Sequence, residues 1–235
     1  MNKQISLYRC NNRIVNDAFD SVVANICLQH EKNNYKSFLL TGCEPGVGTT
    51  TISVELAISL SIAGWNTLLL DCDMRKNMKY KRLNEEAIFG LADYVKGTVF
   101  ENDIIYQTDW KGLDYVPCGI IGNDTPLRML YSQNMSRLMN TLHSDYDYII
   151  IDVPSINSSV DSHILSVKSD ATILIAALDG SSRRYLEDAR EHLIKDGANV
   201  IGVIQNKVAM NAYKAFTKDY DYFNKKRYLK VENEL

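Results

Sequence analysis

The chain lacks the paired cysteines that would build a disulfide scaffold or a zinc site. It has an odd number of cysteines and no CxxC spacing between them, and such a set favours neither kind of site. We therefore expect reduced thiols, as in proteins of the cytosol. The five are Cys10, Cys27, Cys43, Cys72 and Cys118.

Long apolar runs are also missing. No uninterrupted stretch approaches the ~18–20 apolar residues that a membrane-spanning helix needs. The first residues, MNKQISLYRCNNR, lack the apolar core of a secretory signal peptide. These absences predict a cytoplasmic protein with no span of its own, so that recruitment to the inner face of the plasma membrane would need a partner.

Basic residues are not in excess: 26 Lys and Arg against 29 Asp and Glu give a net charge of −3. A general nucleic-acid binder needs a basic field to displace counterions, so we predict no nucleic-acid partner. With 46% hydrophobic and 23% charged residues among 235, the composition is typical of a soluble globular domain.

Short apolar strands alternate with helical patterns along most of the chain. Such alternation is typical of a parallel sheet with helices on both faces. We predict a single α/β domain over residues 1–207 and a tyrosine-rich basic tail over residues 208–235. The expected strands are 37–41, 67–70, 113–117, 148–151, 171–176 and 200–204, and the expected helices are 14–31, 51–63, 90–97, 127–143 and 181–195.

A glycine-containing turn, TGCEPGVGTTT at residues 41–51, joins a predicted strand to an apolar helix. Glycines let successive N–H groups face one concavity, and the positive end of the helix favours phosphate there. We expect Thr50, at the helix start, to bind Mg²⁺. The alternative is a turn that merely uses glycine. The candidate nucleotide-binding residues here are Pro45, Gly46, Val47, Gly48, Thr49, Thr50 and Thr51.

Three aspartates follow predicted strands: Asp71, Asp73 and Asp152. In parallel α/β sheets, ligands bind beyond the carboxyl ends of the strands. Carboxylates that converge there repel one another unless a cation is present, and a magnesium–phosphate complex would supply it. The alternative is that they cap neighbouring helices or loops.

The turn departs from the usual phosphate loop, GxxxxGK[ST], at two positions. Thr49 stands where the lysine is expected, and Cys43 replaces the first glycine. Losing the lysine should cost roughly 1.5–3 kcal/mol of phosphate binding. It should cost a further ~2.7–4 kcal/mol in the transition state, by analogy with the loss of an oxyanion donor. Catalysis is therefore more vulnerable than binding.

Three segments, LLLDCDMRKN (68–77), EPGVGTTT (44–51) and YIIIDVPS (148–155), resemble motifs of the bacterial tyrosine kinases of capsule and exopolysaccharide loci. The first resembles their second Walker motif, the second their phosphate loop and the third their Walker B strand. The resemblance covers about residues 14–230. It implies the P-loop NTPase fold of the MinD/ParA-like group, with ATP and Mg²⁺ as cofactors.

The resemblance also implies residue roles. Asp71 would accept the proton of the attacking hydroxyl, and Asp73 would support it and the metal. Thr50 and Asp152 would organise Mg²⁺. Asn206 lies where the family reads the edge of adenine; the alternative is that it only ends a strand.

The C-terminal segment 213–230 mixes tyrosines with lysine and arginine, and it resembles the family's phosphorylated tail. The alternative is an aromatic and basic end that docks on the domain. The resemblance further implies self-association and a membrane-embedded chain-length regulator that activates the kinase. The candidate phosphoacceptors are Tyr213, Tyr220, Tyr222 and Tyr228.

The chain departs from the family at other places too. Asp17, Asp20 and Val23 stand where relatives carry a glutamate and two arginines for ring assembly, so that contact cannot form as in relatives. Arg128 follows Pro126 where relatives have an acidic residue. Candidates for a compensating cation are Arg75, Lys76, Arg183 and Arg184.

The interpretation we favour is an ATP-binding tyrosine kinase of an exopolysaccharide system that phosphorylates its own tail. The alternatives are a nucleotide-binding pseudokinase, which the absent lysine supports, and a MinD-like switch ATPase. The switch ATPase is weakened because such proteins carry a signature lysine near the loop start, where this chain has Glu44 and Pro45.

Overall fold

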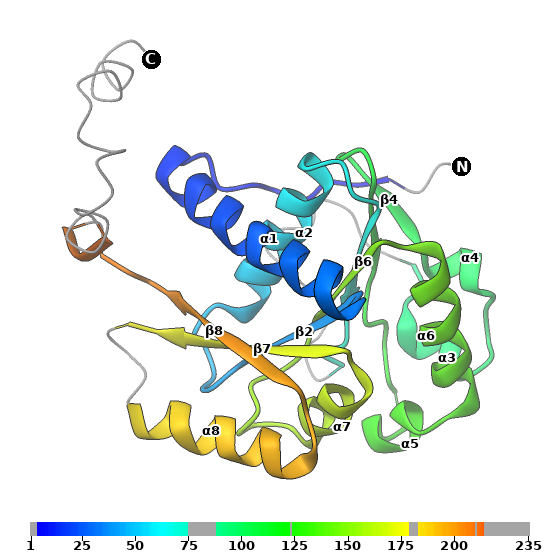
Figure 1. The fold of residues 1–235 in the computed structure, drawn as a ribbon. Helices are drawn as coiled ribbons and strands as arrows, with labels where there is room; N and C mark the ends of the chain where they lie inside the picture. Colours follow the sequence, from blue (N-terminus) through cyan, green and yellow to red (C-terminus); the bar gives the residue numbers. More distant parts are fainter. Residues whose placement is uncertain (1–3, 75–87, 123, 179–182, 210, 214–235) are drawn as a thin grey trace.

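The computed structural model describes residues 4–74, 88–122, 124–178, 183–209 and 211–213. An eight-stranded sheet runs through them in the order β1-β4-β5-β3-β6-β2-β7-β8 (Figure 1). The strands are β1 (Gln4–Ile5), β2 (Ser37–Gly42), β3 (Thr67–Asp71), β4 (Tyr106–Thr108), β5 (Leu113–Val116), β6 (Tyr148–Asp152), β7 (Ala171–Ala177) and β8 (Val200–Asn206). The helices are α1 (Arg13–Asn33), α2 (Thr49–Ile62), α3 (Leu91–Val95), α4 (Glu101–Ile104), α5 (Pro126–Leu130), α6 (Gln133–Asp145), α7 (Val160–Lys168) and α8 (Arg183–Asp196).

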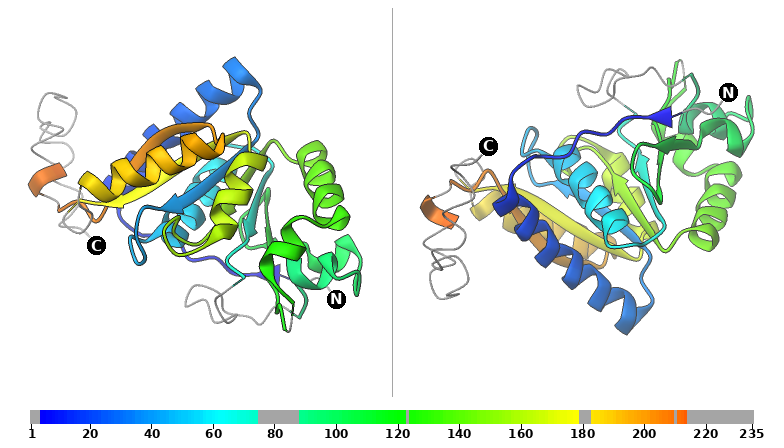
Figure 2. Two further views of the ribbon diagram at one scale, coloured as in Figure 1. Left: turned by 90° about the horizontal axis from the view of Figure 1, so that it is seen from below. Right: turned by 90° about the horizontal axis from the view of Figure 1, so that it is seen from above.

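The sheet is mostly parallel, as predicted. Among the described strands, only the pairing of β4 with β5 is antiparallel. Every residue of β2, β3, β6 and β7 is buried. The reason is visible in Figures 1 and 2, where α1 and α2 cover one face and α7 and α8 the other. Strands enclosed on both faces read as continuous apolar runs.

Helix α2 lies at the centre of one core. All residues from Ile52 to Ser61 are buried, because the helix packs against the sheet on one side and against α1 on the other. A helix that is apolar all round is expected to be enclosed in this way. The strand that precedes it, β2, contributes Phe38 and Leu40 to this core and Leu39 to the core on the opposite face.

The predicted helix 127–143 was wrong, because the structure has two helices there. α5 ends at Leu130, and Ser132 begins α6 by accepting a hydrogen bond from the Met135 N–H at 3.1 Å. A serine at this N-cap position stabilises a new helix start. The spacing of apolar residues continues from α5 into α6, so it did not reveal where one helix ends and the next begins.

Sequence reasoning also missed β1, β4, α4 and α7. The first three are two to four residues long, which is too short to show a period. Helix α7 was hidden because it buries polar residues, among them Asp161, Ser162 and Ser166. No helix of the described residues is long and apolar enough to span a membrane.

Candidate nucleotide-binding site

The strand order brings the predicted site residues to one edge of the sheet. β6 lies between β3 and β2, and all three are parallel. Asp71 and Asp152 are direct register partners at the ends of β3 and β6. The turn that follows β2 lies beside them, as expected for ligands bound at the carboxyl ends of parallel strands.

The turn between β2 and α2 has the backbone of a phosphate loop. Gly46 and Gly48 have φ values of 79° and 94°, in the left-handed region that residues with a Cβ rarely adopt. The N-cap residue of α2 is Gly48, which has no side chain to cap the helix. The first N–H groups of that helix are therefore suited to an anionic ligand.

Thr50 and Asp152 form a hydrogen bond at the N-terminus of α2. The Thr50 hydroxyl donates to Asp152 Oδ2 at 2.6 Å, and the Ser53 hydroxyl donates to Oδ1 at 3.0 Å. Asp152 is only 2% exposed. Hydroxyl and carboxylate oxygens are hard donors, the kind that Mg²⁺ prefers. The chemistry of the pair therefore fits the predicted magnesium site.

Asp71 is held in place from two sides. Its Oδ1 accepts the N–H of Asp73 at 2.9 Å, and its Oδ2 lies 3.4 Å from the Tyr115 hydroxyl that donates to it. Between the two aspartates, burial raises the pKa of the Cys72 thiol well above its ordinary value, and the charge of Asp71 adds to the rise. The thiol is therefore neutral, and the charge at this edge comes from carboxylates.

The protein ligands alone do not make a complete metal site. Within the described ranges, no group of three or more His, Cys, Asp or Glu residues is arranged to hold a metal ion. A cation at Thr50 and Asp152 would need further oxygen ligands, and phosphate and water are the usual source for Mg²⁺. Metal and nucleotide would thus bind together.

Asn206, predicted to read adenine or to end a strand, is the last residue of β8 and contacts the phosphate loop. Its Nδ2 donates to the Val47 carbonyl at 2.8 Å. Lys207, which the sequence reasoning missed, donates from Nζ to the Gly46 carbonyl at 2.8 Å. Its position directly after Asn206 in the sequence was the only available signal.

Of the four cations predicted to compensate for the missing lysine, two are in the described part of the chain. Arg183 and Arg184 pair with Glu187 and Asp188 one turn along α8, at 2.7 Å and 3.8 Å. The remaining two, Arg75 and Lys76, lie outside the described residues, as do Tyr220, Tyr222 and Tyr228.

Tyr213 is the one candidate acceptor within the described residues. Burial raises the pKa of its hydroxyl, and the nearby charge of Asp17 on α1 adds to the rise. Of the positions expected to depart from ring assembly, Asp20 is exposed and Val23 is buried in the core.

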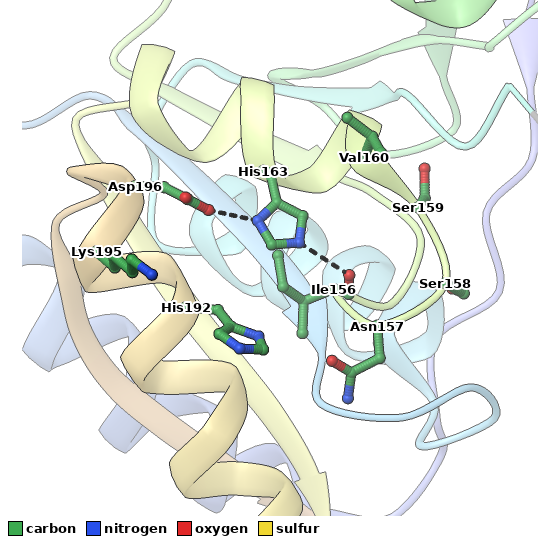
Figure 3. Close-up of a pocket in the computed structure, with 9 residues that line it drawn as sticks. All are labelled: Ile156, Asn157, Ser158, Ser159, Val160, His163, His192, Lys195 and Asp196. Atoms are coloured by element: carbon green, nitrogen blue, oxygen red, sulfur yellow. Dashed lines mark hydrogen bonds and ion pairs between the residues drawn. The ribbon is translucent and has the colours of Figure 1, made fainter.

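A pocket of about 610 Å³ lies between the start of α7 and the end of α8 (Figure 3). His163 joins its walls: Nδ1 pairs with Asp196, and Nε2 lies 3.2 Å from the Ile156 carbonyl. Both partners are acceptors, one a carboxylate and the other a backbone carbonyl. The lining residues are Ile156, Asn157, Ser158, Ser159, Val160, His163, His192, Lys195 and Asp196.

The wall of this pocket is bonded to the phosphate loop. The Ile156 N–H donates to the Gly42 carbonyl at 3.0 Å, and Asn157 Nδ2 donates to the Cys43 carbonyl at 2.8 Å. The segment after β6 therefore fixes the start of the loop, while Asn206 and Lys207 contact its middle.

Comparison with known proteins agrees with this geometry. The AAA domain family matches residues 40–184. The MinD protein of Pyrococcus horikoshii with Mg-ADP has a similar structure at 19% identity, with a TM-score of 0.60 over 77% of this chain and 76% of that one. The chain therefore has the P-loop NTPase fold of the MinD/ParA-like group.

Closer relatives define the family. The tyrosine-protein kinase CpsD of Streptococcus pneumoniae serotype 4 is 32% identical over 83% of this chain and 86% of its own length. The CpsD of Streptococcus agalactiae is 32% identical over 88% and 89%. The chimeric protein CapA2B2 has a TM-score of 0.78 at 26% identity, over 84% of this chain and 86% of that one. The chain belongs to the bacterial tyrosine kinases of capsule and exopolysaccharide systems, as its motifs suggested.

Proposed function

We propose that this protein binds ATP with Mg²⁺ and transfers the γ-phosphate to tyrosine, largely in its own C-terminal tail. The observation that carries the proposal is the Thr50–Asp152 hydrogen bond of 2.6 Å beside a glycine loop. Its relatives are named tyrosine-protein kinases, which supports tyrosine as the acceptor of the phosphoryl group.

The loop would position the phosphates, with residues 45–51 around them. The N–H groups of the loop and of the first turn of α2 would donate to phosphate oxygens. Thr50 and Asp152 would hold Mg²⁺, with Asp73 nearby. Bound Mg²⁺ would neutralise charge on the transferring phosphoryl group.

Asp71 would act as the general base. It would take the proton of the tyrosine hydroxyl as the tyrosine oxygen bonds to the γ-phosphorus, while the bond to the β–γ bridging oxygen breaks and ADP leaves. Asp71 lies beside Asp152 in register, and the Tyr115 hydroxyl and Asp73 N–H orient it. Positioning of a base in this way is how a carboxylate assists such transfer.

The acceptors would be Tyr213, Tyr220, Tyr222 and Tyr228. A tyrosine hydroxyl has an ordinary pKa of about 10, so each acceptor keeps its proton near neutral pH and requires a base. We propose transfer between neighbouring molecules, as the resemblance to the family's tail implies. We further propose that the protein works in the cytoplasm with a membrane-embedded chain-length regulator that activates it, and recruits it to the membrane.

The test is incubation of the purified protein with labelled ATP, with and without Mg²⁺ and the regulator's cytosolic segment. We expect Mg²⁺-dependent label on tyrosine, lost in Asp71→Asn and in a variant with all four tyrosines changed to phenylalanine. Label that survives the four changes would show another acceptor. No label with or without the partner segment would refute transfer.

One observation favours a second function, a pseudokinase that binds nucleotide without turnover. Thr49, at the first position of α2, supplies no positive charge where the phosphate-loop lysine is expected. A melting temperature raised by Mg-ATP without any transfer would support this function. Thr49→Lys should then raise turnover, if only that charge is missing. ATP-dependent dimerisation with phosphate release, and without phosphotyrosine, would instead indicate a switch ATPase.

A further inference from the structure

We infer that Asn206 and Lys207 form a clamp that orients the phosphate loop, which makes Lys207 a positioning residue for nucleotide binding. Two consecutive residues at the end of β8 bond two consecutive loop carbonyls, Val47 and Gly46, each at 2.8 Å. The inference deepens the proposed function and rests on it for the identity of the ligand.

Peptide geometry shows what these two bonds achieve. In a trans peptide, the carbonyl and the next N–H point in opposite directions, and no peptide of the described residues is cis. Holding the Gly46 and Val47 carbonyls toward the end of β8 therefore turns the N–H groups of Val47 and Gly48 away from it. Successive N–H groups turned to one side form the nest that binds an anion.

The clamp holds a backbone conformation that lysine does not favour. Lys207 has φ = 56°, one of two described non-glycine residues with positive φ. The Oδ1 of Asn206 accepts the Lys207 N–H at 2.8 Å, so the same amide holds Lys207 and the loop. Strain that is kept by specific contacts often marks a functional position.

The fit against the loop is also tight. A Cβ placed on Gly48 would lie 2.4 Å from Asn206 Nδ2. Glycine at this position thus serves two purposes: it adopts φ = 94° and it leaves room for the asparagine amide.

Lys207 also brings charge to a loop that has lost its own lysine at Thr49. Its ammonium contacts the loop by donating a hydrogen bond to the Gly46 carbonyl. Because Lys207 is exposed, solvent weakens its field. We therefore expect it to replace the missing lysine only in part.

The experiment compares Mg-ADP affinity by calorimetry in matched variants. Lys207→Met should weaken binding by roughly 3- to 10-fold, because one exposed charge-assisted hydrogen bond is lost. Lys207→Arg should retain most of the affinity, and Thr49→Lys should restore it in the Lys207→Met background. Lys111→Met, which changes an exposed lysine in the turn between β4 and β5, is the control and should bind like the parent.

A second arm needs no nucleotide. Amide exchange and NMR shifts of Val47 and Gly48 should change in Lys207→Met and in Lys207→Gly, which keeps the left-handed backbone but lacks the ammonium, and not in the Lys111 control. Unchanged loop amides and unchanged affinity would overturn the clamp. If the parent protein binds no Mg-ADP, the proposed function fails. The exchange and shifts of the loop amides then show by themselves whether Lys207 orients the loop.

Discussion

Replacing Asp152 with asparagine should stabilise the nucleotide-free protein and abolish its response to Mg²⁺. Asp152 is 2% exposed and is the register partner of Asp71, another buried carboxylate. Two carboxylates at neighbouring positions carry like charges, and like charges repel each other. The asparagine side chain would remove one charge while keeping nearly the same shape.

The magnitude follows from the strand spacing. Neighbouring strands lie about 4.8 Å apart, and two charges about 5 Å apart repel by roughly 3 kcal/mol at an effective dielectric constant of ~20. Asp152 also accepts bonds from Thr50 and Ser53, and weakening one of them costs about 1.5–2 kcal/mol. The net gain is about 1 kcal/mol, which raises the melting temperature by roughly 2–4 °C for a chain of this size.

The assay is thermal unfolding with and without Mg-ADP. At a ligand concentration of ~100 times Kd, the parent should gain about 2.7 kcal/mol, and Asp152→Asn should gain almost nothing. The reasoning is refuted if the nucleotide-free variant melts below the parent, or if Mg-ADP still stabilises it fully.

Asp170→Asn is a matched control: we expect it to lower the stability of the protein, whereas Asp152→Asn should raise it. Burial acts to raise the pKa of its carboxyl, but hydrogen bonds from the backbone and side chain of Ser37, the backbone of Lys36 and His143 outweigh burial and lower it. A lowered folded-state pKa gives stability that is present above the unfolded value of about 3.9 and is lost as the pH falls through the folded value. Asp170→Asn should therefore unfold more easily at pH 7, and the difference from the parent should shrink below pH ~4.

The remaining predictions concern the loop and the core. Gly48→Ala should weaken Mg-ADP binding at least 10-fold in calorimetry, since the new Cβ would displace Asn206. The control is Gly64→Ala, because Gly64 also has a positive φ but has open space around it. Tyr146→Phe should cost about 1–2 kcal/mol in urea unfolding, because its hydroxyl donates to Asp114 at 2.7 Å. A stability equal to the parent would contradict that assignment.

The sequence by itself determined most of the longer elements and the position of the glycine turn. Both depend on local chemistry: apolar runs long enough to be enclosed strands, a helix that is apolar all round, and glycines where the backbone turns. These features predicted β2, α2 and the turn at residues 41–51 almost to the residue. The same local reasoning failed at Ser132, because an apolar period does not show where one helix ends and another begins.

Only the tertiary structure decided which residues meet. Strand order places Asp71 beside Asp152, although the two are far apart in the chain, and it brings Lys207 to Gly46 across 161 positions. No local pattern encodes such pairings, since they follow from how the strands assemble in the sheet. The missing lysine was visible in the sequence, whereas the lysine that contacts the loop from the end of β8 became visible only once the strands were side by side.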